Sequence, residues 1–567
     1  MIGYVCKYTP VEALESMGAE MVRVEPSVVN FDRADALMHP NACSYAKAVL
    51  EEFAKGRYDG LVLTTCCDSI RRLYDVLRDA YPEKFFWMLD VPRVVNGFSA
   101  GIFAKRIRAL AEAYGRYAGA EPDENALREL LLRRAAAAGL RGAPENPDGP
   151  RVGIVGARYG NGFRNVLEDA GARIVFDMTC AGMERRLPPP AGDIPVPEGY
   201  ARALLNQLPC LRMADAAGRR DYLAGFADEL DGVVCHTVKF CDIYSYEYAS
   251  LRRRAKLPIL KLETDTTPQC EGQLRTRAEA FLESLRAAKG KKPAAARAAG
   301  KKDENLFVLG IDSGSTSTNA AVLNGKAELV ASCTVRTGAK VGDSADRVLR
   351  EVLKKAGLAR EGLAAIVATG YGREAIPFAG RAVTEITCHA RGARYFNPKV
   401  RTILDIGGQD SKAIRLNGRG EVADFAMNDK CAAGTGRFLE AMARTLELGI
   451  AELGPVSLRS KKDVTISSMC TVFAESEVIS LIAQNCEKAD IARGVHRAIA
   501  GKACSLLAIA RVHPEPEYMM TGGVARNPGV VRAVEEKLGA ELFLCPDPEI
   551  VGAVGAALFA LDDWKGK

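Results

Sequence analysis

The segment FVLGIDSGSTSTNAAVL, residues 307–323, determines the fold of the C-terminal part of the chain. Its apolar runs on both sides of a glycine turn predict a strand, a tight turn and a returning strand, with Asp312 at the end of the first strand. In that turn the backbone N–H groups of Gly314, Ser315 and Thr316 can form an anion-binding nest. The segment therefore predicts a phosphate site.

The same arrangement recurs in TILDIGGQDSKAIRL, residues 402–416. Two such hairpins in tandem predict a duplicated fold that clamps phosphates from both sides. Asp312 and Asp405 are expected to hold Mg²⁺ through water molecules. The turn of the second hairpin contains Asp405, Gly407, Gly408, Gln409 and Asp410. Asp312, Asp405 and Gln409 are the predicted catalytic residues.

Further glycine turns extend this site. YMMTGGVARNPGV, residues 518–530, reads as a strand that runs into a glycine pair, where adenosine can approach the backbone closely. Each glycine pair alone is an ordinary turn, but the set of three, with ATG at 368–370 and GTG at 434–436, predicts ATP binding. The P-loop pattern is absent. The predicted contacts here are Gly434, Thr435, Gly436, Gly522, Gly523 and Asn527.

Two cysteines in this part, Cys431 and Cys470, each open a segment with helical periodicity. A helix N-terminus stabilises a thiolate and so favours metal or cluster ligation. An iron–sulfur cube usually takes four thiolates, which a two-fold dimer sharing one cube would supply. The alternative is a pair of buried core cysteines.

Composition limits the possible functions. The chain has 567 residues, 48% hydrophobic and 26% charged, so several soluble domains are expected. A net charge of +6 without a basic stripe gives no reason to expect a nucleic-acid partner. No membrane span and no signal peptide are recognisable, so a cytoplasmic location is expected. Sixteen cysteines then favour metal, cluster or redox roles over disulfides.

The stretch RAAKGKKPAAARAAGKKDEN, residues 286–305, has the composition of a linker. Its positive charges could instead mark a nucleic-acid tail, but a solvated linker between two compact parts is the preferred interpretation. The predicted organisation is an N-terminal part at 1–288, a linker at 289–304 and an ATPase part at 305–567.

The N-terminal part alternates strands and helices. Short apolar strands are expected at 59–65, 150–163, 231–237 and 257–265, which predicts α/β architecture with two parallel sheets split near residue 149. The glycine-rich turn after the second of these strands lacks the full dinucleotide-binding spacing.

This part contains nine cysteines. Cys66 and Cys67 follow one predicted strand, and Cys235 and Cys241 lie at the end of another. Ligands in open α/β sheets gather beyond the carboxyl ends of the strands, so these thiols could converge on an iron–sulfur cofactor between two domains. The alternative is scattered core cysteines. The nine are Cys6, Cys43, Cys66, Cys67, Cys180, Cys210, Cys235, Cys241 and Cys270.

The C-terminal part resembles a known family. NDKCAAGTGRF and SSMCTVFAESEVIS are similar to the activating ATPases of 2-hydroxyacyl-CoA dehydratases, in the acetate kinase/Hsp70/actin-like superfamily, and the resemblance runs over nearly all of 305–567. It implies duplicated actin-like, ribonuclease H-like domains and a homodimer whose interface holds one [4Fe–4S] cluster on Cys431 and Cys470. Ferredoxin or flavodoxin is the implied electron donor. Asn319 departs from the family, which carries Lys there.

The N-terminal part has its own resemblance. NACSYAK, CCDSIRRLYD, DGVVCHTVKFCD and LPILKLETDTTPQCEGQLRTRAEAF are similar to the D-component of 2-hydroxyacyl-CoA dehydratases, a Rossmann- or flavodoxin-like fold that includes the double-cubane cluster proteins. By motif, Cys43, Cys67 and Cys241 are implied ligands of a [4Fe–4S] cluster. A double cubane, [8Fe–9S], needs six cysteines, and the surplus favours that branch. The spare candidates are Cys66, Cys180, Cys210 and Cys235.

The resulting hypothesis is an ATP-driven electron pump fused to its iron–sulfur acceptor, which acts on a small molecule. The first alternative is a fused (R)-2-hydroxyacyl-CoA dehydratase subunit with its activator. The second is a sugar- or acyl-kinase-like ATPase with a zinc-binding N-terminal module. Zinc sites prefer CxxC pairs, and the sequence contains none.

Overall fold

The computed structural model describes residues 1–39, 41–137, 146–180, 187, 195–255, 257–267, 271–289, 306–428, 432–466, 470–509 and 516–565. These residues form two compact units, which we call the N-terminal unit (Met1–Ala278) and the C-terminal unit (Glu279–Lys567). The predicted linker beyond residue 289, Cys270 and Cys431 lie outside the described residues.

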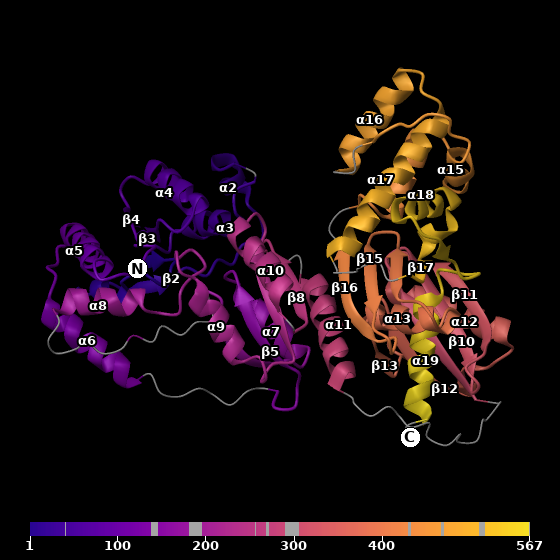
Figure 1. Cartoon of the computed structure of the whole chain (residues 1–567), viewed down its shortest axis with the longest axis horizontal. Helices are drawn as coiled ribbons and strands as arrows, with labels where there is room; N and C mark the ends of the chain where they lie inside the picture. The colour runs from indigo at the N-terminus through magenta and orange to yellow at the C-terminus, as the bar shows by residue number, and fades with distance from the viewer. Residues whose placement is uncertain are drawn as a thin grey trace. The chain divides into compact units, whose positions relative to one another are not determined.

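The N-terminal unit contains two parallel four-stranded sheets, as predicted (Figure 1). The first has the order β2-β1-β3-β4 and the second the order β6-β5-β7-β8. The central strands β3 and β7 are buried along their whole length, which matches their continuous apolar sequences. The strands are β1 (Ile2–Tyr4), β2 (Met21–Arg23), β3 (Gly60–Thr64), β4 (Phe85–Leu89), β5 (Arg151–Gly156), β6 (Arg173–Asp177), β7 (Gly232–Val238) and β8 (Ile259–Thr264).

The helices of this unit connect the two sheets. Helix α8 follows β6 of the second sheet but packs on α5, where Tyr200 shares a core with Phe103 and Leu110 and donates to Glu12 at 2.6 Å. The chain thus returns to the first sheet after residue 149. The helices are α1 (Val11–Glu15), α2 (Asp32–Leu37), α3 (Ser44–Phe53), α4 (Asp68–Ala80), α5 (Ser99–Ala118), α6 (Glu124–Ala137), α7 (Asn161–Asp169), α8 (Val196–Leu205), α9 (Ala217–Gly225) and α10 (Asp242–Arg254).

The C-terminal unit contains two five-stranded mixed sheets with matching orders, β11-β10-β9-β12-β13 and β16-β15-β14-β17-β18. In each, the first three strands are antiparallel and the last two run parallel to the first strand. The repeat confirms the predicted duplicated, actin-like fold. The strands are β9 (Phe307–Ser313), β10 (Ser317–Asn324), β11 (Leu329–Arg336), β12 (Leu363–Thr369), β13 (Arg381–Ala382), β14 (Thr402–Ile406), β15 (Ser411–Leu416), β16 (Val422–Asn428), β17 (Tyr518–Thr521) and β18 (Leu542–Phe543).

Helices α13 and α19 cross closely between the two sheets. A Cβ on Gly555 would lie 1.9 Å from the carbonyl oxygen of Cys388, so glycine is required at this crossing. The helices and 3₁₀ turns of the unit are α12 (Val341–Ala356), η2 (Arg360–Gly362), η3 (Arg373–Ala375), α13 (Glu385–Phe396), α14 (Gly436–Thr445), α15 (Ile450–Ser457), α16 (Thr471–Ala483), α17 (Lys488–Ile509), η4 (Gly523–Arg526), α18 (Pro528–Leu538) and α19 (Val551–Lys565).

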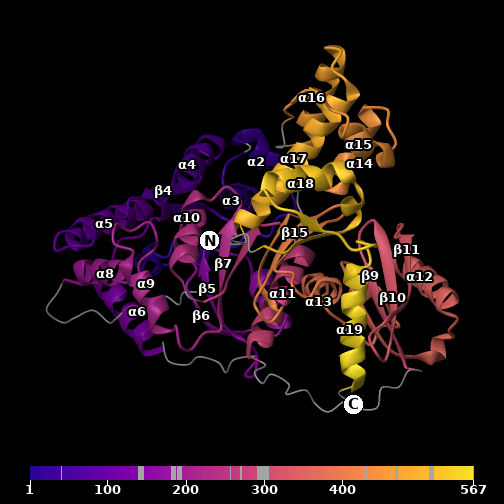
Figure 2. The same ribbon diagram turned by 45° about the vertical axis from the view of Figure 1, so that its right-hand side comes forward.

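Helices α14 to α18 form a helical layer around an apolar core that includes Phe438, Met442 and Val495. Both views place α16 at the end of this layer farthest from α19 (Figures 1 and 2). Among the described residues, none of the helices combines the length and apolarity that crossing a membrane requires.

Helix α11 (Glu271–Lys289) contains the boundary between the two units, which falls after Ala278. Its second half belongs to the C-terminal unit, where Ala280 shares a core with Ile386 and Ala390 of α13. The C-terminal unit therefore begins inside a helix and before residue 288, the predicted end of the N-terminal part.

Candidate functional site

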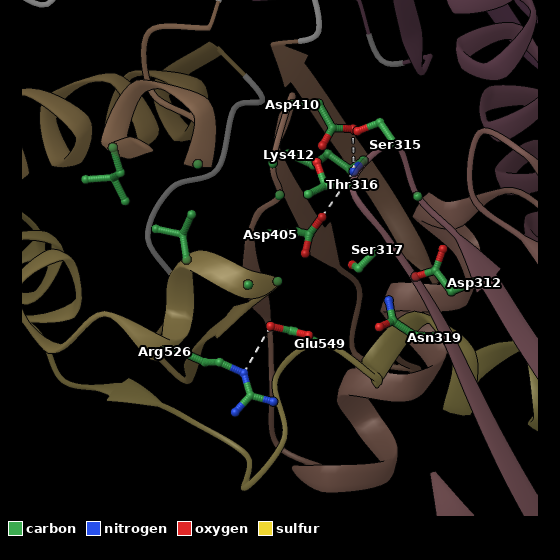
Figure 3. A pocket seen from close by; sticks show the side chains of 18 of the residues that line it. Asp312, Ser315, Thr316, Ser317, Asn319, Asp405, Asp410, Lys412, Arg526 and Glu549 are labelled. Atoms are coloured by element: carbon green, nitrogen blue, oxygen red, sulfur yellow. Dashed lines mark hydrogen bonds and ion pairs between the residues drawn. The ribbon is translucent and has the colours of Figure 1, made fainter. Parts of the chain in front are cut away.

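The predicted nucleotide pocket is a cavity of about 440 Å³ in the C-terminal unit. Its walls come from the turns after β9, β14 and β17, from the start of α14 and from the loop that precedes α18 (Figure 3). The predicted residues that line it are Asp312, Gly314, Ser315, Thr316, Asp405, Gly407, Gly408, Gly436, Gly522, Gly523 and Asn527.

Asp312 lies at the carboxyl end of β9 and is 7% exposed. The backbone closes tightly around its carboxylate: a Cβ on Gly552, in the first turn of α19, would lie 2.2 Å from Oδ2, and a Cβ on Gly370 would lie 2.6 Å from Oδ1. Burial raises the pKa of Asp312, whereas the charges of His389 and Lys412 lower it. The carboxylate is thus fixed in place and faces the pocket.

Lys412 stands among three carboxylates, two of which, Asp405 and Asp410, are labelled in Figure 3. Its Nζ lies 2.7 Å from Asp410 Oδ2, 3.1 Å from Asp405 Oδ2 and 3.4 Å from Glu385 Oε2, and its side chain is 3% exposed. Burial alone would lower the pKa of Lys412, but the three carboxylates raise it well above its usual value. Lys412 is therefore a fixed cation beneath the phosphate turns.

Asp405 accepts a hydrogen bond from Thr521 Oγ1 at 2.8 Å and lies 3.3 Å from His389 Nε2. Burial would lower the pKa of His389, but Asp405 raises it to about 9, so the imidazole is charged at neutral pH. Burial raises the pKa of Glu385 to about 7. The floor of the pocket thus holds opposed buried charges, with Lys412 and His389 as the cations among the carboxylates.

The two phosphate turns approach each other as the tandem hairpins predict. A Cβ on Gly408 would lie 2.1 Å from Thr316 Oγ1, so only glycine allows this approach. Gly522 has φ +84°, and a Cβ there would lie 2.5 Å from the carbonyl oxygen of Ile406. On the other side Arg526 Nε donates to Glu549 at 3.0 Å, and Asn527 Oδ1 caps α18.

The two predicted cluster cysteines of this unit differ in their relation to helices. Cys470 is the N-cap of α16, as predicted. Helix α14 begins at Gly436, not at Cys431, because Gly434 has φ +92° and Thr435 is extended and caps the helix. The prediction that a helix starts at Cys431 was therefore wrong by five residues, and Cys431 itself lies outside the described residues.

Seven cysteines of the N-terminal unit lie close enough for each to affect the pKa of the next, and we call them the thiol row. Adjacent members perturb one another: Cys241 raises the pKa of Cys43, while Cys66 lowers that of Cys67 to about 6. Tyr244 Oη lies 3.0 Å from the Sγ of Cys180. In order, the row is Cys43, Cys241, Cys67, Cys66, Cys6, Cys180 and Cys210.

The row has a simple origin in the fold. Cys43, Cys67 and Cys241 are the N-cap residues of α3, α4 and α10. The other members follow the carboxyl ends of strands or the helix α8. Since parallel strands direct their carboxyl ends to the same edge, both sheets contribute thiols to one place.

The thiol row differs from the predicted set of ligands at two cysteines, because Cys235 lies outside it and Cys6 lies in it. Cys235 lies inside β7, is fully buried and packs with Val155 and Val233. Burial raises its pKa, and the charged groups acting on it are those of Glu247, Lys261 and Arg219. Cys235 thus lies in the sheet's core and outside the thiol row. Cys6, which was not assigned, lies in the thiol row between Cys66 and Cys180.

The thiol row suits an iron–sulfur cofactor by the chemistry of its donors. In the described part of the chain, no three or more His, Cys, Asp or Glu side chains converge as ligands of one ion. The thiolates of a multi-iron cluster surround a larger body and so stand farther apart. An all-thiol donor set, in which the pKa of Cys241 is lowered to about 7 chiefly by its hydrogen bond with Cys43, suits that chemistry.

Comparison with known proteins finds a matching family model for each of the two parts of the chain. The family model "BadF/BadG/BcrA/BcrD ATPase family" matches residues 309–560, and "2-hydroxyglutaryl-CoA dehydratase, D-component" matches 6–140 and 129–285. The 2-hydroxyisocaproyl-CoA dehydratase activator of Clostridioides difficile is 44% identical over 261 residues, which are 46% of this chain and 97% of that protein. The chain belongs to the BadF/BadG/BcrA/BcrD ATPase family. It joins this ATPase domain to an N-terminal D-component domain.

Other members of the BadF/BadG/BcrA/BcrD family are similarly close. The (R)-2-hydroxyglutaryl-CoA dehydratase activating ATPase of Acidaminococcus fermentans is 45% identical over 45% of this chain and 97% of that protein. The activator of lactoyl-CoA dehydratase of Anaerotignum propionicum is 46% identical over 45% of this chain and 98% of that protein. A solved structure of the Clostridium difficile activator with bound ADPNP covers 46% of this chain and 96% of its own, at a TM-score of 0.44.

The pocket of this ATPase includes residues that the sequence reasoning missed. Lys412 is the cross-strand partner of Asp405, and Glu385 and His389 lie four residues apart on one face of α13. That spacing could have identified the last two. Conversely, Gln409 lies outside the described lining, and its side-chain amide faces the guanidinium of Arg437. Gly434 and Thr435 also lie outside it and shape the turn before α14.

Proposed function

We propose that the chain is an ATP-dependent reductase in which the ATPase unit drives low-potential electrons into an iron–sulfur cofactor held by the thiol row. Ferredoxin or flavodoxin is the proposed donor and a small molecule the acceptor. The observation that carries this proposal is the thiol row beside the carboxyl ends of both sheets. Iron–sulfur clusters, when bound, supply one-electron transfer at low potential.

The ATPase residues have separate proposed tasks. The phosphate turns offer backbone N–H groups to the nucleotide, and Lys412 places a fixed positive charge below them. Asp312 and Asp405 would hold Mg²⁺ through waters. Because α14 begins at the pocket, nucleotide closure can move the chain that leads back to Cys431.

A homodimer is supported by the surface of α16. This helix starts at Cys470 and exposes apolar side chains that a second copy could cover. Two copies would bring Cys431 and Cys470 from each chain to one [4Fe–4S] cluster. The exposed side chains are Val472 at 66%, Phe473 at 64%, Ile479 at 55% and Ile482 at 40%.

A fused 2-hydroxyacyl-CoA dehydratase subunit with its activator is the second candidate. It is favoured by the name of the matching D-component family and by the common placement of Cys43, Cys67 and Cys241 as N-caps. Three thiols suit a single cube, whereas the seven-membered row has enough for a larger cofactor. We therefore place the double-cubane reductase first.

Iron content separates the candidates. A double cubane plus a half-share of the interface cluster predicts about ten iron atoms per chain, whereas one cube plus that half-share predicts about six. The measurement is iron and sulfide per chain in anaerobically purified protein, with an EPR spectrum. A preparation that binds zinc and takes up no iron on anaerobic reconstitution would overturn both candidates.

Replacing Cys6 with serine should lower the iron held by the N-terminal unit to about half or less, because a central member of the thiol row is lost. The matched control is Cys235→Ser, which changes a buried thiol of the same unit that belongs to the sheet core. Its iron content should stay at the wild-type value. Equal losses in the two variants would contradict the assignment of the row.

A further inference from the structure

The second half of α11 carries two carboxylates that contact the walls of the nucleotide pocket. Glu279 and Glu283 lie within the C-terminal unit, yet the ATPase family match begins only at residue 309. They fall instead at the end of the D-component match, which reaches residue 285. The C-terminal unit therefore includes residues that lie outside the region matched by the ATPase family model.

Glu283 holds the start of α13. Its Oε1 accepts from the backbone N–H of Thr384 at 3.3 Å, and its Oε2 accepts from the hydroxyls of Thr384 and, at 2.6 Å, Thr387. Thr384 is the N-cap of α13, where a carboxylate also meets the positive end of the helix dipole. The same helix carries Glu385 and His389, which contact Lys412 and Asp405.

Glu279 holds the turn after β12 through Arg373. The guanidinium of Arg373 is 5% exposed, pairs with the Glu279 carboxylate and donates from Nη1 to the carbonyl oxygen of Gly370 at 3.1 Å. Gly370 has φ +86° and packs directly against the Asp312 carboxylate. A shift of this turn would therefore displace the Asp312 carboxylate, which lines the pocket and would hold Mg²⁺ in the proposed function.

We propose that Glu279 and Glu283 are positioning residues for ATP hydrolysis, which act through Arg373 and through the first turn of α13. Glu279 acts on Asp312, and Glu283 acts on Asp405. Both of these carboxylates line the same pocket. Helix α11 is continuous from Glu271 to Lys289, and its first half belongs to the N-terminal unit. The inference rests on the proposed ATPase function.

The test uses full-length Glu279→Gln and Glu283→Gln variants. Each should lower kcat for ATP hydrolysis about tenfold, with the KM for ATP within about threefold of wild type, because a misplaced wall affects the reacting end of the nucleotide most. The half-saturating Mg²⁺ concentration should rise, since Asp312 is displaced in the Glu279 variant and Asp405 in the Glu283 variant. A variant that merely folds less well would contain fewer active molecules. The Mg²⁺ concentration that half-saturates those molecules would stay at the wild-type value, so this measurement separates a positioning role from a loss of folding.

The matched control is Glu374→Gln. Glu374 lies 3.6 Å from the same Arg373, but it is 70% exposed and on the solvent side of the guanidinium. Its kcat and Mg²⁺ dependence should equal those of wild type. In parallel, hydrogen exchange should show that MgATP protects the peptide containing Thr384 in wild type and in Glu374→Gln, but less in the two proposed variants.

Two failures are distinguishable. If wild type hydrolyses ATP and both α11 variants keep its kcat and Mg²⁺ dependence, the positioning role is wrong while the proposed function stands. If wild type itself hydrolyses no ATP, the proposed function fails and the inference fails with it. If the α11 variants and Glu374→Gln lose activity equally, the effect is not specific to Glu279 and Glu283 and the inference is overturned.

Discussion

Replacement of Lys412 by methionine is expected to reduce ATP hydrolysis at least about a hundredfold. Methionine keeps most of the side-chain length but removes the cation that pairs with Asp405, Asp410 and Glu385. These buried carboxylates would then repel one another and the incoming phosphates. Removing one partner of a buried charge cluster also costs about 3–5 kcal/mol of stability, so thermal unfolding is measured beside the steady-state rate.

The control for this variant is Lys326→Met, which removes an exposed lysine from the turn between β10 and β11. It should hydrolyse ATP at the wild-type rate. A Lys412→Met protein that is folded by circular dichroism and retains near-wild-type hydrolysis would contradict the role given to the pocket floor.

Replacement of Cys470 by serine is expected to lower ATP-dependent electron transfer at least about a hundredfold, because a cluster ligand is lost. Serine is a good N-cap residue, so α16 should persist. Cys470 is not among the residues that line the described nucleotide pocket, so the Kd for ATP should stay within about threefold of wild type. Iron content, nucleotide affinity and electron transfer are measured on the same preparation.

Cys504→Ser provides the matched control within the same unit. Cys504 lies on α17 beside the apolar core, and burial raises its pKa to about 11, which disfavours the thiolate. This variant should keep both its iron and its electron transfer. If Cys470→Ser retained a full interface cluster, the shared four-thiolate arrangement would be wrong.

The glycine turns were predictable because their constraints are local. A turn that needs positive φ, as at Gly522, favours glycine whatever lies around it, whereas the need for glycine at Gly408 comes from Thr316 of the other hairpin. The start of α14 was mispredicted for a related reason: helical periodicity alone does not register that Gly434 adopts φ +92°. Periodicity marks a helix's face better than its first residue.

The charged floor and the thiol row depend on tertiary contacts, so the sequence defined them less well. Glu385 meets Lys412, and His389 meets Asp405, only because α13 packs between the two sheets. The choice between Cys6 and Cys235 depends on where each lies relative to a strand end. Cys6 follows β1 and lies in the row, whereas Cys235 lies inside β7 and is buried in the core.

The boundary inside α11 could not be derived from composition. The sequence marks a linker where Ala, Gly and Lys replace the apolar pattern, and that change comes after Lys289. The structural boundary after Ala278 depends instead on packing. From Glu279 onward, α11 belongs to the C-terminal unit, and Ala280 packs in a core of that unit. Glu279 and Glu283 therefore belong to the C-terminal unit of the structure, although the D-component family match includes them.

Nucleotide in the ATPase unit is proposed to drive electrons into the cofactor of the thiol row. This coupling is measured by anaerobic electron uptake of the full chain from a reduced low-potential ferredoxin, followed by the bleaching of cluster absorbance, with MgATP, with MgADP or without nucleotide. We predict that MgATP alone adds electrons beyond those the interface cluster holds, and that Cys6→Ser, but not Cys235→Ser, removes this addition. Equal uptake under all three conditions, or an addition that Cys6→Ser leaves intact, would contradict the proposed coupling.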